Sequence, residues 1–199
     1  MASFRAISAV TQGVVNLLRS SYNRDILGTE LNFAALVAPN FTTNPPMPGI
    51  SLFLYRVVLN GSYRQPAGQM RPDGQREPTR LPLDLHFILT AWAEEASTQH
   101  DIAGWMMRII EDTPILPGPF LNLTVPDAFR PDETVEIVVG EIDSEDLFLL
   151  WERLAPNSYQ LSVPYIARNI WVDSELDVAD GAPVLQRLFD LAVPNGTDG

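Results

Sequence analysis

The chain has 199 residues, of which 46% are apolar and none is cysteine, and its formal net charge at pH 7 is −12. This length and apolar content predict a single domain with its own core, and the lack of cysteine excludes disulfides, thiolate metal sites and cysteine nucleophiles. The negative charge argues against a general nucleic-acid-binding protein, because such proteins need basic surface to displace phosphate counterions.

The charge is also uneven along the chain. Residues 1–126 contain 9 Arg and 10 acidic residues, whereas residues 127–199 contain 4 Arg and 15 acidic residues. Either a solvated face or an electrostatically matched protein partner explains the acidic half. The first residues lack the unbroken apolar region of a signal peptide, and no stretch approaches the about 18 apolar residues of a membrane span. We therefore expect a soluble protein that is not exported by the signal-peptide route, and we expect no membrane contact.

The first third of the chain predicts a helix and two strands. Apolar residues recur at helical spacing over residues 3–21, with Ser3 as a candidate cap. Residues 31–38 and 50–59 are apolar and rich in β-branched or aromatic residues, which favours strands. Between them, the prolines of residues 39–49 predict a loop.

The strongest pattern in the chain runs from residue 81 to residue 112. Apolar residues occupy every second position from Leu81 to Ala91, and Ile88 and Trp92 add apolar positions on the other face. We therefore predict a central strand, part of which is covered on both sides, with Pro82 at its start, where no ladder bond is lost. A helix should follow, capped by Ser97 or Thr98.

A long excursion, residues 60–80, joins the two strongest strands. It carries four arginines against two acidic residues, a local excess of positive charge in an acidic chain. Loops of this length inside a compact domain are usually binding segments or disordered segments, and both interpretations remain open. If the loop binds another subunit, its candidate contact residues are Arg64, Arg71, Arg76 and Arg80.

The second half predicts a proline-punctuated, largely extended stretch over residues 113–133 and a strand over residues 134–142. A helix follows to about residue 154, with Asp143 or Ser144 as its cap and widely distributed apolar residues. Residues 159–172 form the last predicted strand, in which Pro164 indicates an edge position or a bulge. The fold class is therefore α/β (α+β): one domain with a mixed, largely antiparallel sheet flanked by helices.

The composition shifts after residue 173, so we divide the chain into a domain of residues 1–173 and an acidic C-terminal arm of residues 174–199. A short amphipathic helix at residues 183–192 either docks on a neighbouring subunit or folds back on its own domain. The candidate contacts of this arm are Val184, Leu185, Leu188 and Phe189.

No residue pattern predicts catalysis or a metal site. His86 alternates with core positions of a strand and His100 begins a helix, so both favour structural roles. Glu94 and Glu95 are adjacent at a strand end, and their side chains should diverge. An acidic group at Asp143, Glu145 and Asp146 is explained better by helix capping than by cation binding. We expect no enzyme activity, no metal and no cofactor, and we expect the tryptophans to belong to the core.

The order of these elements resembles a known family. The segments FRAISAVTQGVVNLL, ISLFLYRVVLNGSYR, RLPLDLHFILTAW, HDIAGWMMRIIED and YQLSVPYIARNIWVDS, spread over residues 4–174, resemble the terminal cap proteins of extracellular contractile injection systems of the antifeeding-prophage and virulence-cassette type. The shared features are apolar and small-residue patterns without a catalytic signature.

This resemblance implies a fold like that of phage tail-terminator proteins and assembly as a six-fold ring. Such a ring would close the inner tube at the end distal to the baseplate and hold the last sheath ring. The implied partners are further copies of the chain, the tube protein and the sheath protein, within a particle built in the cytoplasm. Two alternatives are a phage neck or head-completion ring protein and an unrelated ligand-binding or enzymatic α/β domain.

Overall fold

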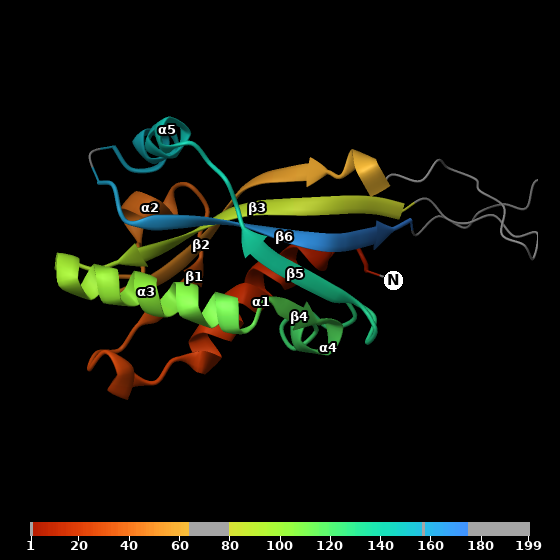
Figure 1. The fold of residues 1–199 in the computed structure, drawn as a ribbon, viewed down its shortest axis with the longest axis horizontal. Coiled ribbons are helices and arrows are strands. Elements are labelled where there is room, and N and C mark those ends of the chain that lie inside the picture. Colours follow the sequence, from red (N-terminus) through yellow and green to blue (C-terminus); the bar gives the residue numbers. More distant parts are fainter. Residues whose placement is uncertain (1, 64–79, 157, 175–199) are drawn as a thin grey trace, which may run out of the picture.

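The computed structural model describes residues 2–63, 80–156 and 158–174 (Figure 1). Six strands form one sheet in the order β1-β2-β3-β6-β5-β4, and every neighbouring pair is antiparallel except β1 and β2. The predicted fold class is therefore confirmed. The strands are β1 Asn32–Ala35, β2 Gly49–Leu59, β3 Arg80–Trp92, β4 Ile115–Pro117, β5 Thr134–Val139 and β6 Ser162–Asp173.

One face of the sheet carries the main core. The helices α1 (Ala6–Ser21), α3 (Ala96–Asp112) and α4 (Gly118–Leu121) pack here. From β3, alternate residues from Leu83 to Ala91 point into this core, as the strand period predicts. Figure 1 shows α3 and α4 on the same side of the sheet.

The described residues cover the opposite face at one end only. There α2 (Asn40–Thr43) and α5 (Ser144–Leu154) enclose a smaller cluster around Phe41, Trp92 and Trp151. The three rings contact one another with centroid distances of 5.4 to 5.8 Å. Trp92 and Trp151 are core residues, as predicted, while Trp105 and Trp171 are half-buried. At the other end of this face the sheet is open.

The position of β3 matches its prediction. It lies between β2 and β6, and its residues from Leu85 to Trp92 are buried except for half-buried His86. A strand needs apolar side chains on both of its faces only where helices cover both faces of the sheet. The polar residues Asp84 and His86 therefore mark the part of β3 that has an open face.

Two helix caps differ from their predictions. Helix α3 begins at Ala96 with Glu95 at the N-cap position, so Ser97 and Thr98 lie inside the helix. Asp143 does occupy the N-cap position of α5, but its side chain makes no capping hydrogen bond. Ser3 precedes α1, whose N-cap residue is Arg5, and the Ser3 hydroxyl accepts from the Arg5 N–H at 3.2 Å.

Two segments predicted from their prolines are more structured than expected. The loop of residues 39–49 contains α2, and the segment of residues 113–133 is not largely extended, since it contains β4 and α4. Pro119 is tolerated because it occupies the first turn of α4, where a backbone N–H has no partner within the helix. The Asn122 side chain then holds the following turn, donating to Phe129 O at 2.8 Å and accepting from Phe129 N at 2.9 Å.

Pro164 lies inside the sheet, at a position where β6 pairs with β3 but not with β5. It stands opposite Ile88 of β3, and the pairing of β6 with β5 ends at Tyr165 and Val139. Beyond that point only Gly140 donates to the Pro164 carbonyl, at 3.0 Å. The predicted edge position is thus local to Pro164 rather than a property of the strand.

Candidate interaction surfaces

The predicted arginine loop and the predicted C-terminal arm both leave the fold at the same end of the sheet. The loop returns at Arg80, the first residue of β3, and the arm follows β6, which ends at Asp173. Arg80 and Asp173 are direct partners across the two strands. Most of the predicted contact residues lie outside the described residues: Arg64, Arg71, Arg76, Val184, Leu185, Leu188 and Phe189.

Arg80 is partly engaged within its own fold. Its Nε lies 3.4 Å from Asp173 Oδ1, and the exposed fractions of the two side chains are 34% and 8%. Neither carboxylate oxygen of Asp173 has a hydrogen bond from the described residues. Burial therefore raises the pKa of Asp173, although Arg80 and the chain's amino terminus oppose this shift. A role of Arg80 toward a partner stays a prediction.

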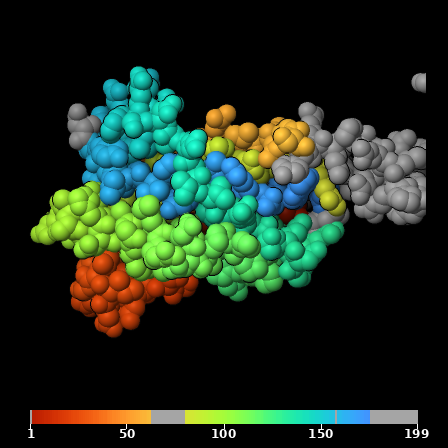
Figure 2. Space-filling view, in the orientation of Figure 1, coloured from red at the N-terminus to blue at the C-terminus, as the bar shows by residue number. Residues whose placement is uncertain are grey.

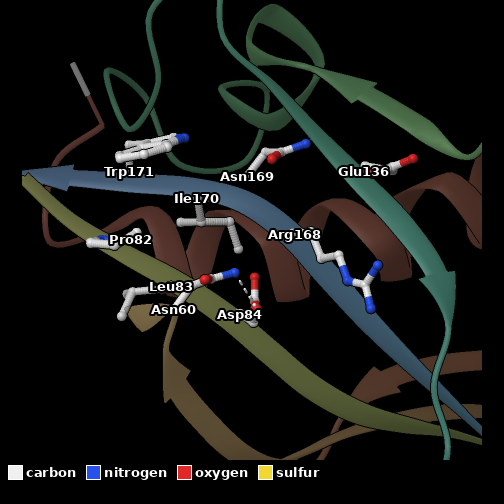
Figure 3. A pocket seen from close by; sticks show the side chains of 9 residues that line it. All are labelled: Asn60, Pro82, Leu83, Asp84, Glu136, Arg168, Asn169, Ile170 and Trp171. Atoms are coloured by element: carbon white, nitrogen blue, oxygen red, sulfur yellow. Dashed lines mark hydrogen bonds between the residues drawn. The ribbon is translucent and has the colours of Figure 1, made fainter. Parts of the chain in front are cut away.

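A shallow groove of about 280 Å³ lies beside this ion pair on the open face of the sheet (Figure 3). Asn60 donates to Asp84 Oδ2 at 2.9 Å, while Arg168 and Glu136 come from β6 and β5. Figure 3 shows α1 passing behind the sheet, so the groove and the main core lie on opposite faces. Trp171 lies at one end.

The sequence did not indicate this groove, because an irregularity in β6 creates it. The register of β3 and β6 shifts between Leu83 and Leu85, and Asn169 adopts a positive φ of 65° opposite this shift. Asparagine tolerates the left-handed region better than most residues, which is the one local signal available. Close opposite charges on a shallow surface fit recognition of another protein rather than catalysis.

A second hollow of about 670 Å³ lies between α5 and the sheet. It brings His86 and Tyr55 together with Asp143 and Asp146, although the sequence pattern connected His86 with neither acidic residue. The rings of Tyr55 and His86 are 6.1 Å apart and meet edge to face. Burial, aided by the positive charge of Arg56, lowers the pKa of His86, so the imidazole is neutral at pH 7.

The other candidate acid and base residues do not converge. Glu94 and Glu95 line a separate hollow of about 400 Å³ with Thr98. His100 is exposed on α3. Across residues 2–63, 80–156 and 158–174, no group of three or more His, Asp or Glu side chains is placed to hold a metal ion. Within the same residues no helix is long and apolar enough to cross a membrane.

Exposed apolar side chains gather at two further places. Phe148 and Leu149 of α5 are 57% and 50% exposed, and Phe148 contacts Tyr159 with a ring-centroid distance of 5.3 Å. The broad apolar distribution predicted for α5 therefore reaches the surface, and the core receives mainly Trp151 and Leu154. The second group is Val57 and Leu59, at the far end of β2. Figure 2 shows β5 and β6 forming the surface between α5 and this end of β2.

The fold is similar to those of two solved terminators. It matches the sheath/tube terminator of PVC, an extracellular contractile injection system, in its extended state, with a TM-score of 0.60 and 16% sequence identity over 97% of this chain. It also matches the tube-terminating cap of the anti-feeding prophage, with a TM-score of 0.56 and 12% identity over 90% of this chain. The chain spans 65% and 59% of the lengths of those two proteins.

At the level of sequence, no curated protein matches the chain. Residues 9–186 match the family described as the Pvc16 N-terminal domain. This match covers most of the chain and agrees with the resemblance inferred from the order of its segments. The chain belongs to the Pvc16 N-terminal domain family.

Proposed function

We propose that this chain is the terminator subunit of a contractile injection system and acts as a structural protein rather than an enzyme. The observation that carries this proposal is the family match over residues 9–186, together with a fold shared with two tube terminators. In this role the chain ends the inner tube distal to the baseplate and anchors the last sheath ring.

The described surfaces support a binding role. The hollows around Asp84, His86 and Glu94 are separate from one another, so their titratable side chains do not converge on one site. Stopping tube growth and holding a sheath ring need complementary protein surfaces, which a mixed-charge groove and exposed apolar side chains can supply.

The finer parts of the proposal concern assembly. The subunits form a ring, which we expect to be hexameric, and the ring is completed in the cytoplasm as part of the particle. The arginines of residues 60–80 clamp a neighbouring cap subunit or the tube ring, and the arm around Val184 and Leu188 contacts the sheath. The boundary after residue 173 separates domain from arm in this scheme.

Imaging of particles produced with and without this gene tests the proposal. Loss of the gene should give tubes of uncontrolled length, or sheaths that detach at the end distal to the baseplate. A plasmid-borne copy should restore particles of uniform length. Particles of normal length with intact sheaths in the absence of the gene would rule out the terminator role.

A further inference from the structure

The outer edges of the sheet differ in how they are protected. At β1, Arg19 donates to the Phe33 carbonyl at 2.9 Å and so occupies a backbone acceptor. At β4, Pro117 lacks a backbone donor. The third edge belongs to β2, because β1 pairs only with its first four residues, from Gly49 to Leu52. Its last four residues, Arg56–Leu59, pair with β3 alone among the described residues, and we call them the free edge.

Among the described residues, the free edge has backbone groups without a strand partner. Asn60 N donates to Pro82 O at 3.0 Å, and in an antiparallel pair every second residue bonds to the same neighbour. The backbone groups of Val57 and Leu59 therefore point away from β3. Open strand edges of this kind are templates for a further strand, and proteins that do not use them usually carry charges or prolines there.

The side chains at the free edge are apolar, whereas charged side chains would protect the edge against pairing with another strand. Val57 and Leu59 are 45% and 54% exposed, and they share a face with the core residues Leu85 and Leu83. Within the described part of the chain, the apolar face thus continues to the margin of the sheet. Figure 1 shows the orange end of β2 at this margin. On the other face of the edge, Arg56 is exposed.

A complementary strand pattern follows β6 directly in the sequence. In Glu175-Leu176-Asp177-Val178, acidic and apolar residues alternate with the period of a strand. Paired with the free edge, Leu176 and Val178 would share a face with its apolar side chains. The acidic residues would lie on the face of the exposed arginine. We propose that residues 175–178 of one subunit add a strand to the free edge of a second copy.

Chain length favours a second copy over the same molecule. The outer side of β2 lies three strand spacings from β6, or about 14 Å. Leu59 pairs with Leu83, and Asp173 pairs with Arg80, so β2 also ends about 10 Å short of Asp173 along the sheet. Covering this diagonal needs about five extended residues. The chain's own residues 175–178 are used up before they reach the edge.

Such an exchange joins unlike surfaces, because each copy donates an arm and accepts another at its edge. Contacts of this kind generate closed rings when the rotation between subunits closes. The inference therefore states how the subunits of the proposed ring are joined. It rests on the proposed function only for the role of that ring in the particle.

Two variants of the full chain separate the donor from the acceptor. The edge variant carries Val57→Lys and Leu59→Lys, and the arm variant carries Leu176→Asp and Val178→Pro. A control variant carries Leu123→Lys and Val37→Lys, which place the same charges on exposed apolar sites elsewhere, at 74% and 62% exposure. Thermal unfolding and circular dichroism verify that each variant folds.

Sedimentation velocity across the micromolar range measures assembly. The wild type and the control should form oligomers as concentration rises, while the edge variant and the arm variant should each remain monomeric. Mixed together, these two variants should form dimers and nothing larger, because one intact arm meets one intact edge. A peptide of residues 174–182 should dissociate wild-type oligomers, and its scrambled version should not.

A wild type that stays monomeric, an edge variant with the wild-type mass distribution, or a mixture that fails to dimerise would overturn the inference. These outcomes are distinct from failure of the terminator role. If an edge variant that does not oligomerise still caps particles correctly, the strand exchange is wrong and the terminator role stands. If particles are normal without the gene but the two mixed variants form dimers, the terminator role is wrong and the strand exchange stands.

Discussion

At the scale of single residues, the buried hydroxyl of Ser162 organises the smaller core. It accepts a hydrogen bond from Trp151 Nε1 at 3.1 Å and lies 2.9 Å from Thr90 Oγ1. Across the same cluster, Trp92 Nε1 donates to Ser51 Oγ at 2.8 Å. Buried indole N–H groups need such acceptors, because an unpaired donor keeps its full desolvation cost.

We therefore expect Ser162→Ala to destabilise the protein by about 1–3 kcal/mol, since it leaves the Trp151 donor without its acceptor. Urea denaturation followed by tryptophan fluorescence measures this loss. The exposed Ser158→Ala serves as the matched control and should change stability little. Equal effects of the two substitutions would show that the hydroxyl of Ser162 does not support the cluster.

Asp173 should make stability depend on pH in the unusual direction for a carboxylate. Its folded pKa is raised, so its contribution to stability is fully present below the unfolded pKa and is lost as pH rises through the folded pKa. The advantage of Asp173→Asn over the wild type, in free energy of unfolding, should therefore be greater at about pH 7 than at about pH 3. Denaturation of both proteins at the two pH values measures it, and a larger advantage in acid would contradict this assignment.

At the scale of elements, helix α3 begins without a side-chain cap. Glu95 occupies the N-cap position with extended backbone angles, φ −101° and ψ 136°, and its side chain is exposed. Serine at such a position accepts a hydrogen bond from the first turn of the helix, whereas the longer glutamate does not do so here. Ser97 lies one residue inside the helix.

Glu95→Ser should consequently stabilise the protein by about 0.5–1 kcal/mol, measured by thermal or urea denaturation. Ser97→Ala should be neutral or slightly stabilising, because alanine is the better residue within a helix. A loss of about 1 kcal/mol on Ser97→Ala would instead identify Ser97 as the cap.

At the scale of the whole molecule, the arginine loop and the C-terminal arm start beside each other at one end of the sheet. Arg80 and Asp173 join their starting points, so contacts made by either segment act on the same edge of the domain. We expect replacement of Arg64, Arg71 and Arg76 by Ala to disturb ring or particle assembly without unfolding the domain. Electron microscopy of particles measures assembly, and circular dichroism measures folding.

The matched control for this triple variant replaces the exposed residues Arg5, Arg24 and Arg130 by Ala, which removes the same charge elsewhere. Normal assembly of the control with defective assembly of the loop variant would locate the effect in the loop. Particles of normal number and length from the loop variant would remove the clamp from the proposed function.

The sequence by itself determined the elements that carry a strong apolar period. The alternation from Leu81 to Ala91 identified β3 as the central strand, and the order of segments identified the family, because burial on both faces leaves a clear pattern in the residues. Tertiary structure alone decided what depends on pairing. The short reach of β1 left the free edge of β2, and the irregularity at Asn169 opened the groove beside Asp84. Neither follows from local period, because strand neighbours and register are set by contacts between segments distant in the chain.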